Sequence, residues 1–215
     1  MGNDRQHPAG TGWCLVVPVK LLHLAKSRLS TDVEVRAALA LAFAADTVAA
    51  ALRAPSVVEV VVVTDDPTAA ALVRGLGAEV ISDEPDAGLN PALRHGAAHA
   101  VARHPQCGVG ALSADLPALK SEDLEKALRR ATEVGTAVVA DVDGTGTTAY
   151  LVTAGRNFEP AFGPDSLKAH IDAGATPLPG ADLPTLRRDV DTRADLNAAF
   201  ALGLGPHTMN TLHRL

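Results

Sequence analysis

The sequence predicts an α/β protein with a doubly wound, mixed but mostly parallel sheet and helices on both faces. Apolar, strand-like runs alternate with Ala/Leu-rich helical segments from residue 13 onward. The run VVEVVVV at 57–63 is apolar on both faces, as in buried strands of parallel sheets. The alternation breaks over residues 148–190, where we expect antiparallel strands.

Each element follows from its local pattern. Strands are expected at 13–19, 57–63, 79–82, 108–113, 136–140 and 148–153, and helices at 34–52, 67–76, 90–104, 121–133, 164–173 and 192–202. Gly77 ends the second helix, Asn90 before a proline caps the third, and Ser121 caps the fourth. No repeat or long linker divides these elements, so residues 13–215 are expected to form a single domain after a disordered tail, 1–12.

Composition argues against several classes of protein. A net charge of −6 disfavours nucleic-acid binding, which depends on phosphate neutralisation. No stretch is expected to span a membrane, because Asp46 interrupts the longest apolar helix. Cys14 and Cys107 lie in apolar surroundings without metal-ligand spacing and are interpreted as buried free thiols. We therefore expect a cytoplasmic protein with no nucleic-acid or membrane partner. Its oligomeric state stays open, and a homo-oligomer is possible.

Two donor-rich turns flank the strand at 148–153. The first is the Gly/Thr run GTGTT at 144–148, and the second is FGPDS at 162–166. In the second, Pro164 is expected at the first helical position and Ser166 in the first turn, where free N–H groups favour an anion. His170, one turn later, either faces a ligand or only covers the helix. The two turns form either an anion pocket or an ordinary hairpin and capped helix.

A basic loop follows the first strand. Three cations lie within nine residues, although the chain as a whole is acidic: Lys20, Lys26 and Arg28. No glycine occurs between them. At the carboxyl end of a strand, such a loop is well placed to bind phosphates by charge. A solvated basic loop is the alternative.

Carboxylates follow other strands. Asp115 comes directly after the buried strand at 108–113, and Asp189 and Asp191 alternate with Val190 in an extended segment. Mg²⁺ is commonly held by one or two carboxylates together with substrate phosphates. We expect Asp115 and Asp189 to be the metal pair. Asp191 or Thr192 is expected to cap the helix that follows, with Asp195 as its partner.

Several of these motifs, taken together, resemble one family, the phosphoenolpyruvate / 2-phospho-L-lactate guanylyltransferases of coenzyme F-420 biosynthesis. The matching motifs occur in the family's order: PVK at 18–20, AKSRL at 25–29, LN at 89–90, DLP at 115–117, GTGT at 144–147, FGPDS at 162–166 and DVDT at 189–192. The resemblance implies a nucleotide-diphospho-sugar-transferase-like fold, GTP and Mg²⁺ as requirements, and release of pyrophosphate. It also implies that Asp115 and Asp189 hold the metal and that Thr148, Gly163 and Ser166 contact the phosphorylated three-carbon acid.

A catalytic assignment follows for such a reaction. A phosphate monoester is already a nucleophile near neutral pH, so no general base is needed. Asp115, Asp189 and Lys26 are expected to be catalytic, and Lys20, Lys26, Arg28 and Asn90 to bind the nucleotide. The acidic loop DEPD at 83–86 offers carboxylates for the N–H edge of guanine, although such loops are usually solvated.

Two alternatives remain at this stage. One is another nucleotidyltransferase of the same fold, acting on a sugar phosphate or a molybdenum cofactor; these usually have a Gly-rich first loop, which Pro18, Val19 and Lys20 do not provide. The other is a non-catalytic nucleotide-binding module, which does not require the acidic pair. The sequence does not distinguish phosphoenolpyruvate from 2-phospho-L-lactate.

Overall fold

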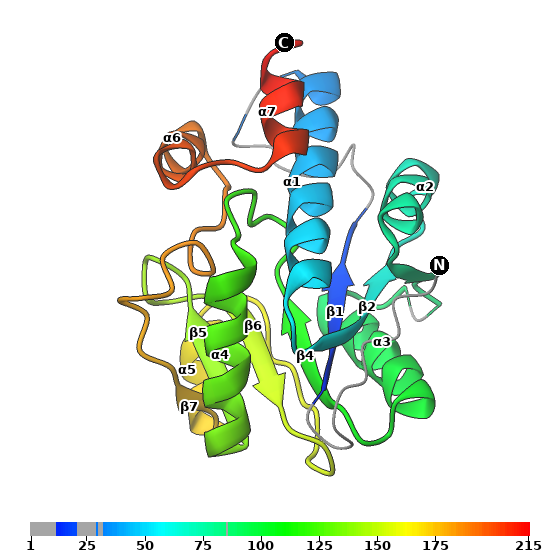
Figure 1. Ribbon diagram of the computed structural model, residues 1–215, viewed down its shortest axis with the longest axis vertical. Helices are drawn as coiled ribbons and strands as arrows, with labels where there is room; N and C mark the ends of the chain where they lie inside the picture. The colour runs from blue at the N-terminus through cyan, green and yellow to red at the C-terminus, as the bar shows by residue number, and fades with distance from the viewer. Residues whose placement is uncertain (1–11, 21–28, 30–31, 85) are drawn as a thin grey trace.

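Seven strands form one sheet at the centre of the molecule. The computed structural model describes residues 12–20, 29, 32–84 and 86–215. The strands are β1 (Trp13–Pro18), β2 (Val57–Val63), β3 (Glu79–Ile81), β4 (Gly108–Leu112), β5 (Thr136–Ala140), β6 (Thr147–Val152) and β7 (Thr176–Pro177). Their order is β3-β2-β1-β4-β6-β5-β7 (Figure 1).

The strand directions confirm a mostly parallel sheet. β1 pairs in parallel with β2 and β4, β2 with β3, and β5 with β7. In the described part of the chain, β6 alone runs antiparallel to its neighbours, β4 and β5. The expected break in the alternation is therefore this one strand, and the two-residue β7 is an addition that the sequence pattern did not reveal.

Helices cover both faces of the sheet, as predicted. They are α1 (Val33–Arg53), α2 (Pro67–Leu76), α3 (Leu89–Arg103), α4 (Ser121–Val134), α5 (Ser166–Asp172), α6 (Arg193–Leu202) and α7 (Pro206–Leu212). Leu15 and Val17 pack in one cluster with residues of α1, α2 and α4, whereas Val16 packs in another with α3. This alternation of buried residues places apolar side chains of β1 on both faces.

Several helix starts differ from the prediction. Gly88, at φ +104°, is the N-cap of α3, so Asn90 lies inside the helix and its capping role was wrong. Lys120 rather than Ser121 precedes α4. Helix α5 begins at Ser166 instead of residue 164, after Asp165 in the left-handed region at φ +53°. Capping side chains did not reveal where these helices begin. In α3 and α5 the residue before the helix has a positive φ and provides no capping side-chain oxygen.

Helix α1 is the one described helix long and apolar enough, by length and composition, to cross a membrane. This corrects the expectation that Asp46 removes any such segment. Much of α1 is buried, and the Asp46 carboxylate accepts hydrogen bonds from the N–H groups of His207 (3.0 Å) and Thr208 (2.8 Å) at the start of α7. Asp46 therefore caps a helix that the sequence analysis missed, and α1 packs as a core helix.

The two cysteines are free, as predicted, although only Cys14 is fully buried. Burial raises the pKa of both thiols. Ligand-type atoms of Cys14, Glu59 and His104 lie within 4.8 Å of one another, a grouping that spacing along the chain did not predict. The predicted tail, 1–12, lies outside the described residues except for Gly12, which is buried and whose carbonyl accepts a hydrogen bond from Gly108.

Candidate functional site

The site lies at the carboxyl ends of the parallel strands. From β1 the chain proceeds outward to β2 and β3, then returns to β4 on the other side of β1. Such a reversal of strand order opens a crevice in which ligands of α/β proteins bind. Two cavities occupy this edge and share Pro18, Val19, Lys20 and Leu89 as lining residues. The second cavity, of about 370 Å³, extends to Asp115 and Asp191.

An acidic cluster forms the centre of the site. The N–H of Val190 donates to the carbonyl of Asp115 at 3.1 Å, which holds the 189–191 segment beside the end of β4. Val190 is fully buried, while Asp189 and Asp191 on either side line cavities. The expected meeting of Asp115 and Asp189 is thus present in the fold.

The pKa of Asp189 reflects how close these acids lie. Burial, followed by the negative charges of Asp115, Asp191 and Asp141, raises the pKa of Asp189 to about 7. Carboxylates held this close repel one another, and a bound cation would relieve that repulsion. The donor set consists of oxygen atoms only, which suits Mg²⁺. The residues therefore fit a magnesium site.

Asp191 and Asp141 also lie near Asp189, and the sequence did not assign either of them to the metal pair. Thr192 caps α6 through a reciprocal capping box with Asp195, so the main role proposed for Asp191 as a cap was wrong. Asp191 instead lines both cavities that meet the acidic cluster. Asp141 follows β5 directly, so the signal that singled out Asp115, an acid at the carboxyl end of a strand, was present there too.

Cations surround the acidic cluster. Lys20 lines both cavities at the end of β1, whereas Lys26 and Arg28 lie outside the described residues. Arg188 shares a third cavity, of about 290 Å³, with Asp189 and Asp191. Its Nε is shielded from solvent and has no hydrogen-bond partner among the described residues, and its Nη1 lies 3.7 Å from Asp195. Arg188 was not predicted, since it precedes Asp189 in a segment without a distinctive basic pattern.

The two donor-rich turns meet, as their proposed role required. The N–H of Leu167 donates to the carbonyl of Thr145 at 3.1 Å, so the start of α5 lies against the Gly/Thr run. However, the Asp141 carboxylate accepts from the N–H groups of Thr145 (3.0 Å) and Gly146 (2.8 Å). These two amides are therefore occupied by an internal carboxylate and are not available for a phosphate.

The residues expected to contact the acid substrate differ in accessibility. Gly163 is exposed, and at φ +140° with open space at its Cβ position it leaves room beside the backbone. Ser166 is 2 % exposed and Thr148 fully buried, with the Thr148 hydroxyl 3.5 Å from the carbonyl of Val139. Contact of a substrate with the Thr148 side chain requires the surrounding residues to open, and the role of all three residues stays a prediction.

Asn90 and His170 hold the 161–166 loop from two sides. The Asn90 amide donates to the carbonyl of Phe162 at 2.9 Å and accepts from its N–H at 2.8 Å. Asn90 thus lies against the loop expected to bind the acid, and its predicted contact with nucleotide stays untested. Phe162 itself lines the cavity that contains Asp115.

His170 is a buried anchor. Its Nε2 accepts from the N–H of Ala161 at 2.9 Å, so the ring proton is on Nδ1, which lies 3.1 Å from the Thr147 hydroxyl. The ring stacks on Tyr150 with a centroid distance of 4.5 Å. Burial lowers the pKa of His170, and the imidazole therefore acts as a neutral link between β6, α5 and the loop.

Fold and site together define the class of structure: an α/β fold with an acidic centre between cavities. Similar folds occur in a nucleotidyl transferase from Methanothermobacter thermautotroptrophicus (TM-score 0.59, 17% identity, 90% of this chain and 98% of that chain). They also occur in a 4-diphosphocytidyl-2C-methyl-D-erythritol synthase from Anaerococcus prevotii (TM-score 0.55, 13% identity, 89% and 98%). A protein of Desulfovibrio desulfuricans G20, provisionally named a nucleotide-diphospho-sugar transferase, matches with a TM-score of 0.61 at 17% identity (88% and 96%). The predicted nucleotide-diphospho-sugar-transferase-like fold is thereby confirmed.

Sequence comparison identifies the family. The family model "Guanylyl transferase CofC like" matches residues 13–215, and the chain belongs to this family. The phosphoenolpyruvate guanylyltransferase of Thermomonospora curvata is 56% identical over 209 residues, covering 97% of this chain and 92% of the relative. The protein of that name in Streptomyces coelicolor is 50% identical over 205 residues (94% and 97%). The chain is thus a nucleotidyltransferase of the guanylyltransferase type, and the resemblance deduced from short motifs is confirmed.

Proposed function

We propose that this protein transfers the guanylyl group of GTP to phosphoenolpyruvate, giving enolpyruvyl-diphospho-5'-guanosine and pyrophosphate. A phosphate oxygen of the acid forms a bond to the α-phosphorus of GTP. The bond from that phosphorus to the oxygen bridging to the β-phosphorus breaks, and its electron pair leaves with pyrophosphate. The observation that carries the proposal is the acidic cluster of Asp115, Asp189 and Asp191, which lies between two cavities.

No general base is needed for this step. The second pKa of a phosphate monoester is about 6, so the acceptor is mostly dianionic near neutral pH. The difficulty is to bring two anions together in line, which requires neutralising charge and fixed positions. A site of carboxylates, cations and fixed loops meets that requirement, and it differs from the Ser-His-Asp type of site.

The chain's residues divide the work. Asp115 and Asp189, with Asp191, would hold Mg²⁺, which when bound supplies positive charge for the phosphate oxygens. Lys20, and in the same loop Lys26 and Arg28, are assigned to the triphosphate and the leaving pyrophosphate. Asn90, predicted as a nucleotide contact, acts in this proposal through the Phe162 backbone instead.

The acceptor lies on the β5–β6 side of the acidic cluster. Arg188 offers a planar, cationic donor in the third cavity, suited to a carboxylate or phosphate. Gly163 leaves its backbone accessible, and Ser166 and Thr148 complete the predicted contacts. We propose 2-phospho-L-lactate as the alternative acceptor, biosynthesis of coenzyme F-420 as the pathway, and the cytoplasm as the place of action.

Release of pyrophosphate tests the proposal. The protein is incubated with GTP and Mg²⁺ and, separately, phosphoenolpyruvate, 2-phospho-L-lactate or 3-phosphoglycerate. We expect release with phosphoenolpyruvate, and its dependence on Mg²⁺ tests the cofactor. Release with none of the three acids would refute the proposal, and release with a sugar phosphate would favour another nucleotidyltransferase of this fold. Asp115→Asn is expected to lose turnover, and a thermal unfolding curve is expected to show that this variant is still folded.

A further inference from the structure

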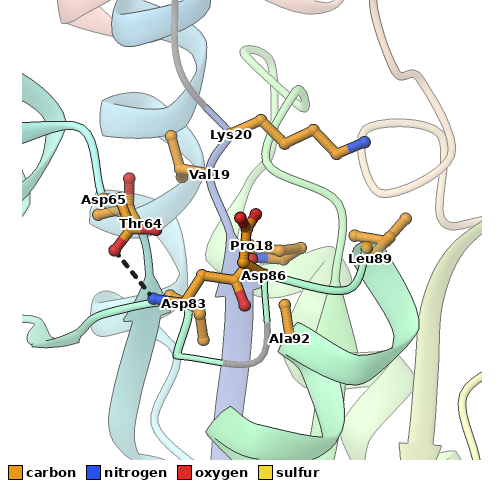
Figure 2. Close-up of a pocket in the computed structure, with 11 residues that line it drawn as sticks. Pro18, Val19, Lys20, Thr64, Asp65, Asp83, Asp86, Leu89 and Ala92 are labelled. Carbon is orange, nitrogen blue, oxygen red and sulfur yellow. Dashed lines mark hydrogen bonds between the residues drawn. The ribbon is translucent and has the colours of Figure 1, made fainter.

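The first of the two cavities at the carboxyl edge of the sheet has a charge pattern of its own. This cavity, of about 260 Å³, lies over the ends of β1, β2 and β3 and is called here the base cavity (Figure 2). Its polar side chains include Lys20, Asp65, Asp83 and Asp86. Because it shares Lys20 and Leu89 with the cavity that reaches Asp115, one extended ligand can occupy both.

The charge of the base cavity limits what it can bind. Three carboxylates and one lysine line the base cavity, so a phosphate or a carboxylic acid placed there would meet net repulsion. Carboxylates are hydrogen-bond acceptors only when ionised. The base cavity therefore suits an uncharged group that is rich in N–H donors, and of the two proposed substrates only the nucleotide carries one.

Asp83 is positioned by its own backbone. The N–H of Asp83 donates to Asp65 Oδ1 at 3.1 Å, the bond drawn as a dashed line in Figure 2. The N–H of Asp86 donates to the carbonyl of Asp83 at 3.0 Å. These two hydrogen bonds hold the backbone of Asp83 in place.

One oxygen of Asp83 has no partner. Oδ1 is shielded from solvent and makes no hydrogen bond in the part of the chain that the structure describes. A shielded carboxylate oxygen without a donor is costly to leave unpaired. A ligand whose N–H group reaches this oxygen removes that cost, which favours a donor-bearing ligand at this point.

We propose that Asp83 selects guanine by accepting hydrogen bonds from its N1–H and its 2-amino group. This inference rests on the proposed use of GTP and adds the residue that chooses the base. Guanine is the one common base with two adjacent donors on its Watson–Crick edge, which match the two oxygens of a carboxylate. Adenine and cytosine each present a ring-nitrogen acceptor beside a single amino group, and uracil flanks its N3–H with two carbonyls. Each of them would place an acceptor against Asp83.

Base analogues test the proposal. Inosine triphosphate lacks the 2-amino group, and xanthosine triphosphate has a carbonyl in its place. Asp83→Asn keeps the side chain's shape but replaces one acceptor with an NH₂ donor, which matches the xanthine carbonyl. For this variant we expect kcat/KM with GTP to fall about 10- to 100-fold, the loss of a charged hydrogen bond, and kcat/KM with the xanthosine nucleotide to rise.

Glu84→Gln is the matched control. Glu84 is the exposed neighbour in the same loop and does not line the base cavity, and its replacement removes the same charge. We expect this variant to keep the wild-type preference for GTP over inosine and xanthosine triphosphates. In Asp83→Asn the preference for GTP over the inosine nucleotide should disappear, because the 2-amino group has lost its carboxylate partner.

Equilibrium binding separates this inference from the proposed reaction. Calorimetry with GDP, ADP and xanthosine diphosphate, without acceptor, reads base selection even if no pyrophosphate is ever released. The inference is supported if wild type binds GDP more tightly than ADP and Asp83→Asn binds xanthosine diphosphate more tightly than GDP. Unchanged base preference in Asp83→Asn, or the same change in Glu84→Gln, overturns it and leaves the proposed transfer reaction intact.

Discussion

Replacing Asp189 by asparagine should stabilise the metal-free protein while it removes activity. In the native state the pKa of Asp189 is raised from 3.8 to about 7, by burial first and then by neighbouring carboxylates. An acid whose pKa is raised on folding costs stability at high pH, and that cost fades as pH falls towards the pKa of the unfolded chain. Asparagine has nearly the same shape and carries no charge, so it removes the cost.

The magnitude follows from the shift. About three pKa units at about 1.4 kcal/mol each give a cost of up to about 4 kcal/mol at about pH 8, where Asp189 is ionised in both states. At about pH 5 it is ionised only in the unfolded chain, and the cost is about 1.5 kcal/mol. The stabilisation by Asp189→Asn should therefore shrink by more than half between these pH values.

Urea unfolding of both proteins with a chelator present, at a series of pH values, measures this difference. Asp143→Asn is the control, because Asp143 lines the same cavity but does not contribute to the Asp189 shift; it should change the free energy of unfolding by less than about 0.5 kcal/mol. Added Mg²⁺ should raise the melting temperature of wild type but not of Asp189→Asn. This account of the acidic cluster would be refuted if Asp189→Asn lowered the free energy of unfolding, or if its effect on that free energy did not change with pH.

Three further predictions concern buried polar contacts. Asp46→Ala should lower the free energy of unfolding by about 1–3 kcal/mol in urea, because the first N–H groups of α7 lose their acceptor; no loss would mean that α7 is held by apolar packing alone. Asn90→Ala should raise KM for the acid acceptor roughly tenfold, more than KM for GTP, because it releases Phe162; the opposite order in steady-state kinetics would restore Asn90 as a nucleotide contact. Wild type should lose stability relative to His170→Asn as pH falls below about 6.5, since the lowered pKa keeps the buried ring neutral while the unfolded chain takes up protons; parallel stability curves for the two proteins would contradict this.

Local patterns predicted most elements to within a residue or two. The doubly apolar run at 57–63 matches β2, and the helix at 67–76 matches α2, including its end at Gly77. Errors gathered at helix starts, where Gly88 and Asp165 adopt positive φ. Helix α7 was missed because its first N–H groups are satisfied by Asp46, which lies far away in sequence.

The candidate site was predicted in part. Asp115 was singled out because it follows a buried strand, and Asp189 because no helix cap explained it; the bond from Val190 to Asp115 brings their segments together. Asp191 was assigned to a helix cap that Thr192 supplies. The donors of the Gly/Thr run were expected to face an anion, but Asp141 from the same hairpin accepts two of them.

The class of fold, the family and the types of charge in the site can all be deduced from the order of residues along the chain. Strand and helix periodicity depend on neighbours along the chain, and the family's motifs are short and local. Only the tertiary structure decided which donors and acceptors remain for a ligand. Among the described residues, Arg188 Nε and Asp83 Oδ1 have no hydrogen-bond partner, while the amides of Thr145 and Gly146 donate to Asp141. Hydrogen bonding and burial are settled by neighbours in space, which spacing along a chain does not record.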